Sequence, residues 1–208
     1  GQYEYLGILE LGKFEIPFLL LAIGLLINAT NYIDGIDGLL LTFFLSCLIF
    51  YIFLIDDTKT INLLKFFIIT GFLNLILNLL PSKNRFKLFS GDSGSLFIGF
   101  FISFMTIELY SSFNIHPSVL IWPLWYPVYD FLFVSINRII NKKSIFKPDN
   151  THFHHVIIKK FNGKKLFPII IFLLVNSSII FIGYKISEVS KLLSLSTFIL
   201  GFSLFFII

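Results

Sequence analysis

The stretch NATNYIDGIDG, residues 28–38, places two asparagines and two aspartates at the end of one long apolar run and directly before another. An α-helix needs about 20 apolar residues to cross the hydrocarbon core of a bilayer. Runs of about this length cover residues 16–33, 38–55, 61–80, 94–113, 117–137, 166–185 and 190–208. The sequence therefore predicts an all-α, polytopic membrane protein with about seven transmembrane helices.

Composition supports the same fold class. Of the 208 residues, 56% are hydrophobic and 13% are charged, whereas about a quarter of residues are charged in soluble domains. The single cysteine, Cys47, excludes a disulfide within the chain and a cysteine-rich metal site. We expect a single membrane domain over residues 1–208, with a short extracytoplasmic hairpin or loop at 1–15.

Basic residues are concentrated in two loops. Of the 16 Lys and Arg residues, three lie in the loop at 81–93 and eight lie between Arg138 and Lys165. Positively charged loops of membrane proteins face the cytoplasm. We therefore predict that the turn at 33–38, the loop at 81–93 and a basic loop at 138–165 are cytoplasmic.

The first polar cluster lies at the end of the first predicted helix. Asn28, Asn31 and Asp34 are spaced by three, which places them on one side of a helix, and Asp37 follows across a turn at Gly35. Carboxylates at the end of a membrane helix are expected to face a water-filled cavity or a cation rather than lipid. The alternative is that the asparagines only cap helices or bond between them.

The second cluster is FSGDSGSLFIGF, residues 89–100, directly before another predicted helix. Gly91 and Gly94 flank Asp92 and permit close approach of a ligand to the backbone, and a helix N-terminus attracts phosphate. The alternative is that Asp92 and Ser93 are simple helix caps.

The third cluster is KPDNTHFHHVIIKK, residues 147–160, with His152, His154 and His155. These histidines could bind phosphate, bind zinc, or belong to a basic loop that touches lipid headgroups. The hard carboxylates of the other clusters and the lack of cysteine ligands favour magnesium and phosphate over zinc.

In this order, the three clusters resemble the motifs of the polyprenyl-phosphate N-acetylhexosamine-1-phosphate transferases, glycosyltransferase family 4. The resemblance rests on NATNYIDGIDGLL, on NLLPSKNRFKLFSGDSGSLFIGF and on YPVYDFLFVSINRIINKKSIFKPDNTHFHH, and the last segment is similar to the WecA type rather than the MraY type. The resemblance implies transfer of a sugar 1-phosphate from a UDP-sugar to polyprenyl (undecaprenyl) phosphate. This reaction releases UMP and initiates synthesis of a cell-envelope polysaccharide such as lipopolysaccharide O-antigen.

The resemblance also implies roles for residues of this chain. Asp34, Asp92, His152, His154 and His155 would be catalytic, and Asp92 would bind Mg²⁺, for which Mn²⁺ could substitute. Substrate-binding roles fall on Asn28, Asn31, Gly35, Asp37, Asn78, Phe89 and Arg138, with Asn78 and Phe89 at the uridine end and Arg138 at the pyrophosphate.

Partners and location follow from the same resemblance. The partners implied are a UDP-N-acetylhexosamine, polyprenyl phosphate and the lipid bilayer, with a homodimer as a candidate assembly and no nucleic acid. The location implied is the inner (plasma) membrane, with the active site on the cytoplasmic face.

One departure from the family pattern is serious. The family has helices before this region that carry a paired-aspartate motif, and Asp56 and Asp57 cannot replace it because they lie on the opposite side of the predicted membrane. We expect the chain to be the C-terminal part of a longer enzyme and to be inactive alone. The alternatives are a noncatalytic membrane scaffold and, less favoured, a transporter with ionisable groups along its helices.

Overall fold

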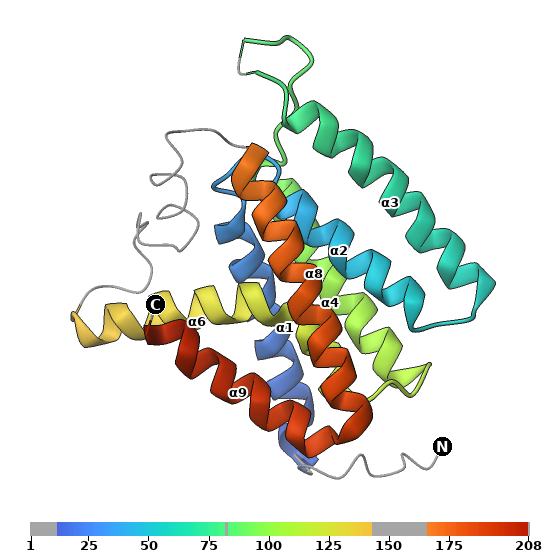
Figure 1. The fold of residues 1–208 in the computed structure, drawn as a ribbon, viewed down its shortest axis with the longest axis vertical. Coiled ribbons are helices and arrows are strands. Elements are labelled where there is room, and N and C mark those ends of the chain that lie inside the picture. The colour runs from blue at the N-terminus through green and yellow to red at the C-terminus, as the bar shows by residue number, and fades with distance from the viewer. Residues whose placement is uncertain (1–11, 82, 143–165, 208) are drawn as a thin grey trace.

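The computed structural model describes residues 12–81, 83–142 and 166–207, and they fold into a bundle of helices (Figure 1). Several helices gather at the centre, while α3 and α9 lie along two flanks of the bundle. The elements in chain order are η1 (Gly12–Phe14), α1 (Glu15–Ile33), α2 (Leu39–Phe53), α3 (Thr58–Asn78), α4 (Gly91–Ser111), α5 (Pro117–Leu120), η2 (Trp122–Leu124), α6 (Trp125–Ile140), α8 (Leu166–Val189) and α9 (Lys191–Ile207).

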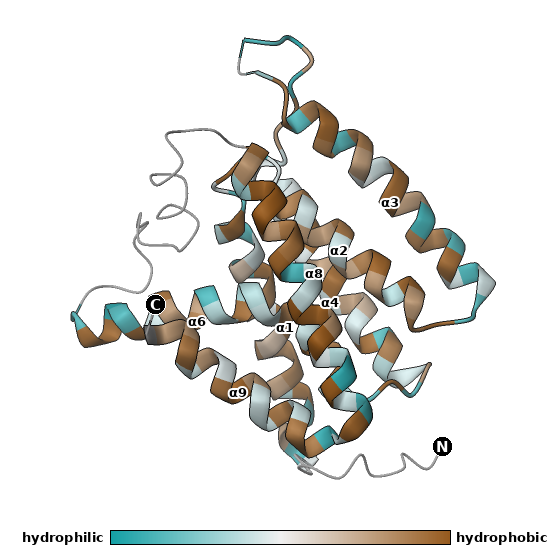
Figure 2. Cartoon of the chain, in the orientation of Figure 1, coloured by the Kyte–Doolittle hydropathy of each residue, from teal (hydrophilic) through white to brown (hydrophobic). Residues whose placement is uncertain are grey.

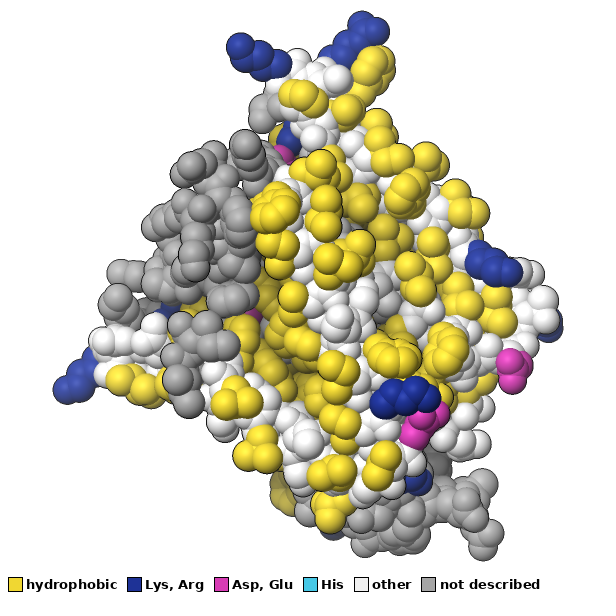
Figure 3. All heavy atoms as spheres, in the orientation of Figure 1, with side chains coloured by type: hydrophobic (Ala, Val, Ile, Leu, Met, Phe, Trp, Pro, Cys, Tyr) yellow, Lys and Arg dark blue, Asp and Glu magenta, His cyan; other side chains and the backbone are white. Residues whose placement is uncertain are grey.

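The predicted all-α, multi-pass fold is confirmed. Among the described residues, five helical segments are long and apolar enough to cross a membrane, and α2 and α9 are shorter apolar helices. Hydrophobic residues cover most of the length of the helices, and hydrophilic residues colour the loop between α3 and α4 (Figure 2). Hydrophobic side chains also spread over the face seen in Figure 3, with Lys and Arg mostly at its margins.

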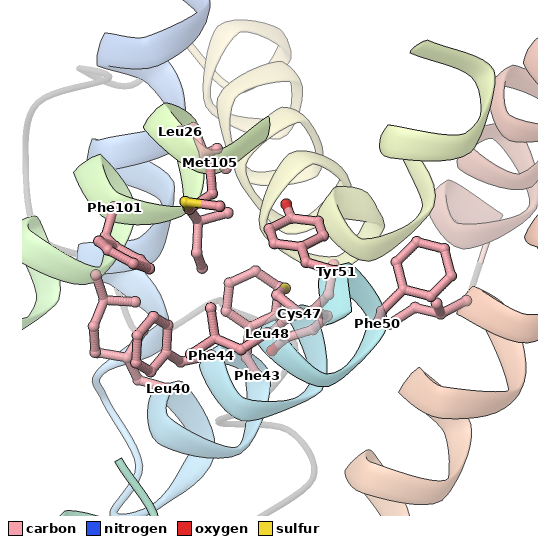
Figure 4. Close-up of a cluster of buried hydrophobic side chains, with 14 of the residues drawn as sticks. Leu26, Leu40, Phe43, Phe44, Cys47, Leu48, Phe50, Tyr51, Phe101 and Met105 are labelled. Atoms are coloured by element: carbon pink, nitrogen blue, oxygen red, sulfur yellow. The ribbon is translucent and has the colours of Figure 1, made fainter. Parts of the chain in front are cut away.

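The helix α2 forms the core of the bundle. Nearly all of its side chains are buried, and Phe43, Cys47 and Tyr51 are fully enclosed (Figure 4). The Tyr51 hydroxyl forms a hydrogen bond of 2.7 Å with Thr106 of α4, so the one polar atom of this ring is satisfied. Because most of α2 is buried, although Ile49 and Phe53 are exposed, its two ends fix where the connections to α1 and α3 lie.

The helices α1 and α4 pack closely against each other. The approach depends on Gly99 of α4, where an added Cβ would lie 2.8 Å from the Cα of Ile27 in α1. Small residues at a membrane-helix interface allow backbones to approach in this way. The C-terminal end of α1 is thereby held beside the N-terminal end of α4.

The predicted span at 117–137 is present as the candidate span Pro117–Ile140, but a 3-10 turn interrupts its α-helix. The short helix α5 begins at Pro117, a favourable first position for proline, and is followed by a 3-10 turn that contains Pro123. The adjacent indoles bind neighbouring helices: Trp122 Nε1 donates to Ser194 Oγ and Trp125 Nε1 donates to Asn176 Oδ1, each at 2.8 Å. The first bond attaches η2 to α9, and the second attaches the start of α6 to α8.

Helices α1 to α4 run in alternating directions, as do α8 and α9, whereas α6 runs across the bundle (Figure 1). The 34–38 turn, the loop between α3 and α4 and the start of α8 lie toward one end in Figure 1, and the α2–α3 and α8–α9 turns lie toward the other. Of the two extramembrane segments that we expected at 1–15 and 138–165, residues 1–11 and 143–165 lie outside the described part of the chain. The cytoplasmic orientation of either end stays a prediction.

Candidate active site

The turn at 34–38 connects α1 to α2 and carries two aspartates. Gly38 closes the turn with φ +82°, a left-handed conformation that side chains other than glycine rarely adopt. An added Cβ at Gly38 would also lie 2.8 Å from Leu79 Cδ2, so the turn is folded tightly against the end of α3. The predicted turn is present, although its left-handed residue is Gly38 rather than Gly35.

Asn78, the last residue of α3, joins this turn to the loop that follows α3. Its side-chain Oδ1 accepts a hydrogen bond of 2.5 Å from the backbone N–H of Gly38, and its Nδ2 donates to the carbonyl oxygen of Leu88 at 2.9 Å. The side chain is buried. An amide is suited to this place because it donates to one backbone segment and accepts from another.

Lys87 forms a second link between the same two segments. Its Nζ lies 2.5 Å from Asp37 Oδ2 and donates to the carbonyl oxygen of Leu80 at 3.1 Å. The side chains of Lys87 and Asp37 are only 3% and 15% exposed. The ammonium group also lies 5.0 Å from the centre of the Phe89 ring, within the range of a cation–π interaction.

Asp34 lies at the C-terminal end of α1 and Asp92 lies in the first turn of α4, within electrostatic range of each other. Burial raises the pKa of Asp34 to about 6, a hydrogen bond from Ser90 acts in the opposite direction, and the charges of Asp37 and Asp92 raise it further. Electrostatic coupling of this kind requires the carboxylates to be near one another. Ser90 rather than Asp92 occupies the N-cap position of α4, and no side chain caps the helix there, so Asp92 is not the simple cap considered above.

Asn31 links α1 to α4 directly behind these carboxylates. Its Oδ1 accepts a hydrogen bond of 2.5 Å from Ser95 Oγ, and Ser95 is fully buried. The hydroxyl of Thr30 lies 3.3 Å from the backbone oxygen of Ser95 and also bonds to its own helix. Polar bonds between membrane helices therefore hold the two acidic ends together.

A hollow of about 310 Å³ adjoins the site between α2, α3 and α4. Asn78, Phe89 and Ser90 line it, so it adjoins the loop between α3 and α4. Phe44 and Phe67 form part of its apolar lining. The site thus borders both charged groups and hydrophobic surface.

The other predicted residues are less closely tied to this centre. Asn28 is exposed, and its Nδ2 donates to Gly24 O of the same helix at 2.8 Å. Gly35 is exposed in the turn, the Phe89 side chain is 68% exposed, and Arg138 is buried in the last turn of α6. The structure does not describe the three predicted catalytic histidines, His152, His154 and His155.

Three site residues were missed by reasoning from sequence: Lys87, Ser90 and Ser95. Lys87 was counted only as one basic residue of a loop, and the serines only as neighbours of Asp92. Ser95 follows Asp92 by three positions, and its hydroxyl bonds to the Asp92 carbonyl at 3.1 Å. That helical spacing was the one available signal for a second polar group at the α1–α4 contact.

The arrangement of acidic groups fits a hard divalent cation. Among the described residues, no three His, Cys, Asp or Glu side chains form a ready-made metal site. Magnesium usually takes only one or two protein carboxylates and keeps several waters. The charge of Asp92 raises the pKa of Asp34, so a cation between or beside the two carboxylates would relieve this repulsion.

The chain resembles curated proteins over most of its length. The sequence profile of glycosyl transferase family 4 matches residues 2–110. The undecaprenyl-phosphate alpha-N-acetylglucosaminyl 1-phosphate transferase of Escherichia coli (strain K12) is 33% identical over 178 residues, which are 82% of this chain and 47% of that protein. The Yersinia pestis protein of the same name is 30% identical over 204 residues, 94% of this chain and 55% of that protein.

A third relative comes from Bacillus subtilis. The probable undecaprenyl-phosphate N-acetylglucosaminyl 1-phosphate transferase of Bacillus subtilis (strain 168) is 37% identical over 153 residues, 70% of this chain and 41% of that protein. The chain spans about half the length of the curated relatives that it matches.

Proposed function

Because this chain belongs to glycosyl transferase family 4, we propose that it forms part of a membrane enzyme that transfers N-acetylhexosamine 1-phosphate from a UDP-sugar to polyprenyl phosphate. The phosphate of the polyprenyl lipid attacks the β-phosphorus of the UDP-sugar, the bond to the UMP oxygen breaks, and UMP leaves. The products are UMP and a polyprenyl diphosphate sugar. The curated relatives carry names that describe this class of reaction.

The observation that carries the proposal is the electrostatic interaction of Asp34 and Asp92 at the junction of α1 and α4. The two carboxylates come from separate sequence motifs, and the charge of Asp92 contributes to the raised pKa of Asp34. Phosphoryl transfer depends mainly on positioning and on neutralising charge on the phosphate oxygens. A paired acidic site at the end of membrane helices supplies a place for the required cation.

We assign the cation to Asp92, with Asp34 beside it. A bound Mg²⁺ ion would neutralise charge on the diphosphate oxygens of the donor. Ser90 orients Asp34 through a hydrogen bond, and Asn31 fixes the facing helix through Ser95. The protein groups thus supply a rigid frame, which is the condition for efficient transfer between two bound substrates.

We assign the uridine end of the donor to Asn78, Phe89 and Asp37. Phe89 presents an exposed ring beside a hollow that Asn78 also lines, and aromatic rings of this kind stack on nucleobases. Gly35 is exposed between the two aspartates and leaves the turn accessible. Asn28 has its amide engaged within α1, so we assign it only a supporting role.

The diphosphate would also meet the segment between α6 and α8. Arg138 lies in the last turn of α6, and His152, His154 and His155 follow it in sequence. We propose that these groups bind the pyrophosphate and that the site faces the cytoplasm, where UDP-sugars and the basic loops would both be found.

The test uses the protein at its natural length, purified in detergent and supplied with Mg²⁺ and undecaprenyl phosphate. We expect release of UMP from UDP-N-acetylglucosamine that depends on both the lipid and the metal. Donors with other N-acetylhexosamines would define the sugar. Absence of lipid-dependent UMP release from every such donor would overturn the proposal.

A further inference from the structure

The residue that the proposed reaction leaves without a role is Lys87. Lys87 lies in the 79–90 loop, and its side chain is buried. The other basic residues in the described part of this loop, Lys83 and Arg85, are exposed. Burying a lysine removes it from water and is unfavourable unless charged and polar partners surround it. Here the partners are the Asp37 carboxylate and the Leu80 carbonyl.

Each partner of Lys87 belongs to the nucleoside end of the site. Asp37 is on the 34–38 turn, Leu80 starts the loop, and Phe89, whose ring lies 5.0 Å from the ammonium group, ends it. One side chain therefore fixes a carboxylate and an exposed aromatic ring relative to each other. Asn78 links the same two segments, but through their backbones: it bonds to Gly38 N and to the Leu88 carbonyl.

We propose, on the basis of the function given above, that Lys87 is a positioning residue for nucleotide binding, which holds Asp37 and Phe89 in the arrangement that receives the uridine. Lys87 acts through these two groups and need not touch the nucleotide. The positive charge of Lys87 is responsible for this positioning, because it neutralises the carboxylate of Asp37 and attracts the face of the Phe89 ring. Asn78 supplies the backbone link, while Lys87 places the side chains.

The proposal predicts a selective effect on nucleotide affinity. Lys87→Met keeps the apolar stem and removes the charge, so the Kd for UMP and the KM for the UDP-sugar should rise roughly tenfold or more while kcat changes little. Lys87→Arg retains the charge and should recover most of this affinity. Lys83→Met removes a charge from the exposed part of the same loop and should bind UMP as the unaltered protein does.

A double-variant comparison tests whether Lys87 acts through Asp37. In an Asp37→Asn background, the further change Lys87→Met should weaken UMP binding far less than it does when Asp37 is present. If Lys87→Met alone does not fold, the double variant still allows the test. Its Asp37→Asn change removes the carboxylate that Lys87 would otherwise no longer neutralise.

Calorimetric UMP titrations, thermal denaturation and steady-state kinetics give distinguishable outcomes. A lower Tm for Lys87→Met with an unchanged Kd for UMP would reduce Lys87 to a structural residue and overturn the inference. Equal losses in Lys87→Arg and Lys87→Met would also overturn it, because the charge would not be the feature that matters. If the unaltered protein neither binds UMP nor releases it, the proposed function fails first and this inference fails with it.

Discussion

Ser95 of α4 donates a hydrogen bond of 2.5 Å to Asn31 of α1, although the two residues lie 64 positions apart in sequence. One helical turn further along α4, Gly99 admits the backbone of α1 at Ile27. These two contacts set the spacing of the helices just behind Asp34 and Asp92. The acidic pair therefore depends on packing inside the membrane as much as on the loops that carry it.

Gly99→Ala should separate α1 from α4. The new Cβ would lie 2.8 Å from Ile27 Cα, so the backbones must move apart, and overpacking of this kind destabilises by about 1–3 kcal/mol. We expect a lower Tm and a loss of UMP release greater than the loss of folded protein. Gly24→Ala is the matched control, since a Cβ there meets nothing within 4 Å, and it should be close to neutral. Equal behaviour of the two variants would show that the close approach has no role.

Asp92→Asn should remove the divalent cation without unfolding the bundle. Asp92 is exposed in the first turn of α4, and asparagine preserves its shape while removing the charge. We expect Mn²⁺ binding, followed by electron paramagnetic resonance, and Mg²⁺-dependent UMP release to fall by at least about a hundredfold. Asp57→Asn is the control: Asp57 Oδ2 accepts from Thr60 N at the start of α3, and asparagine caps helices equally well. Unchanged Mn²⁺ binding by Asp92→Asn would show that the metal assignment is wrong.

The affinity for divalent cations should rise with pH through about 6. Burial, with the charges of Asp37 and Asp92, raises the pKa of Asp34 to about 6, so below that pH the carboxyl is largely protonated and a cation must displace the proton. Mn²⁺ affinity should then fall about tenfold for each pH unit below 6 and level off above about 7. Asp34→Asn should flatten this profile, and a profile that is the same in both proteins would contradict the assignment.

In the absence of metal, the free energy of unfolding should decrease as pH rises toward 6, whereas the affinity for cations increases. A carboxyl whose pKa is about 6 in the folded protein and 3.8 as a free group binds its proton more tightly when folded. The free energy of unfolding therefore decreases as pH rises from about 4 to 6 and is constant with respect to this group above that range. Added Mg²⁺ should reverse the decrease in the unaltered protein, and Tm measurements across this interval would check both statements.

Asn78→Ala should loosen the connection between the 34–38 turn and the loop after α3. The change removes the hydrogen bonds to Gly38 N and Leu88 O and leaves the buried Gly38 N–H without this partner, at a cost of about 1–3 kcal/mol. We expect a lower Tm and weaker UMP binding. Asn74→Ala, one turn earlier, removes an exposed amide that bonds to its own helix, and it should change Tm much less.

The membrane helices and the acidic motifs could be predicted from sequence for simple reasons. Apolar runs of spanning length have few alternative structures, and alternation of helix direction brings the ends after Ile33 and before Gly91 to the same side. The 3-10 turn before α6 was not predicted, because Trp122, Pro123 and Leu124 carry no charge that would interrupt the apolar run; Pro123 was the available signal. A search for apolar runs therefore passes over the point at which a 3-10 turn interrupts the α-helix.

The position of Lys87 shows a different limit. Counting basic residues predicts which side of the membrane a loop occupies, but it treats Lys83, Arg85 and Lys87 alike. Only the folded loop turns one of them inward to Asp37. The partner of a buried charge is set by tertiary structure, so a sequence motif that contains one member of the pair does not identify the other.

The shortness of α2 determines the depth at which the chemistry would occur. Its 15 residues extend about 22 Å at 1.5 Å per residue, roughly 8 Å less than the hydrocarbon thickness of about 30 Å. The end of α2 next to Asp57 leads to an exposed turn. With that end at one membrane surface, a helix of this length would place the aspartate turn in a depression below the opposite surface. A water-soluble nucleotide would descend into that depression, while the phosphate of a long-chain lipid would reach it from the side with its tail still in the bilayer.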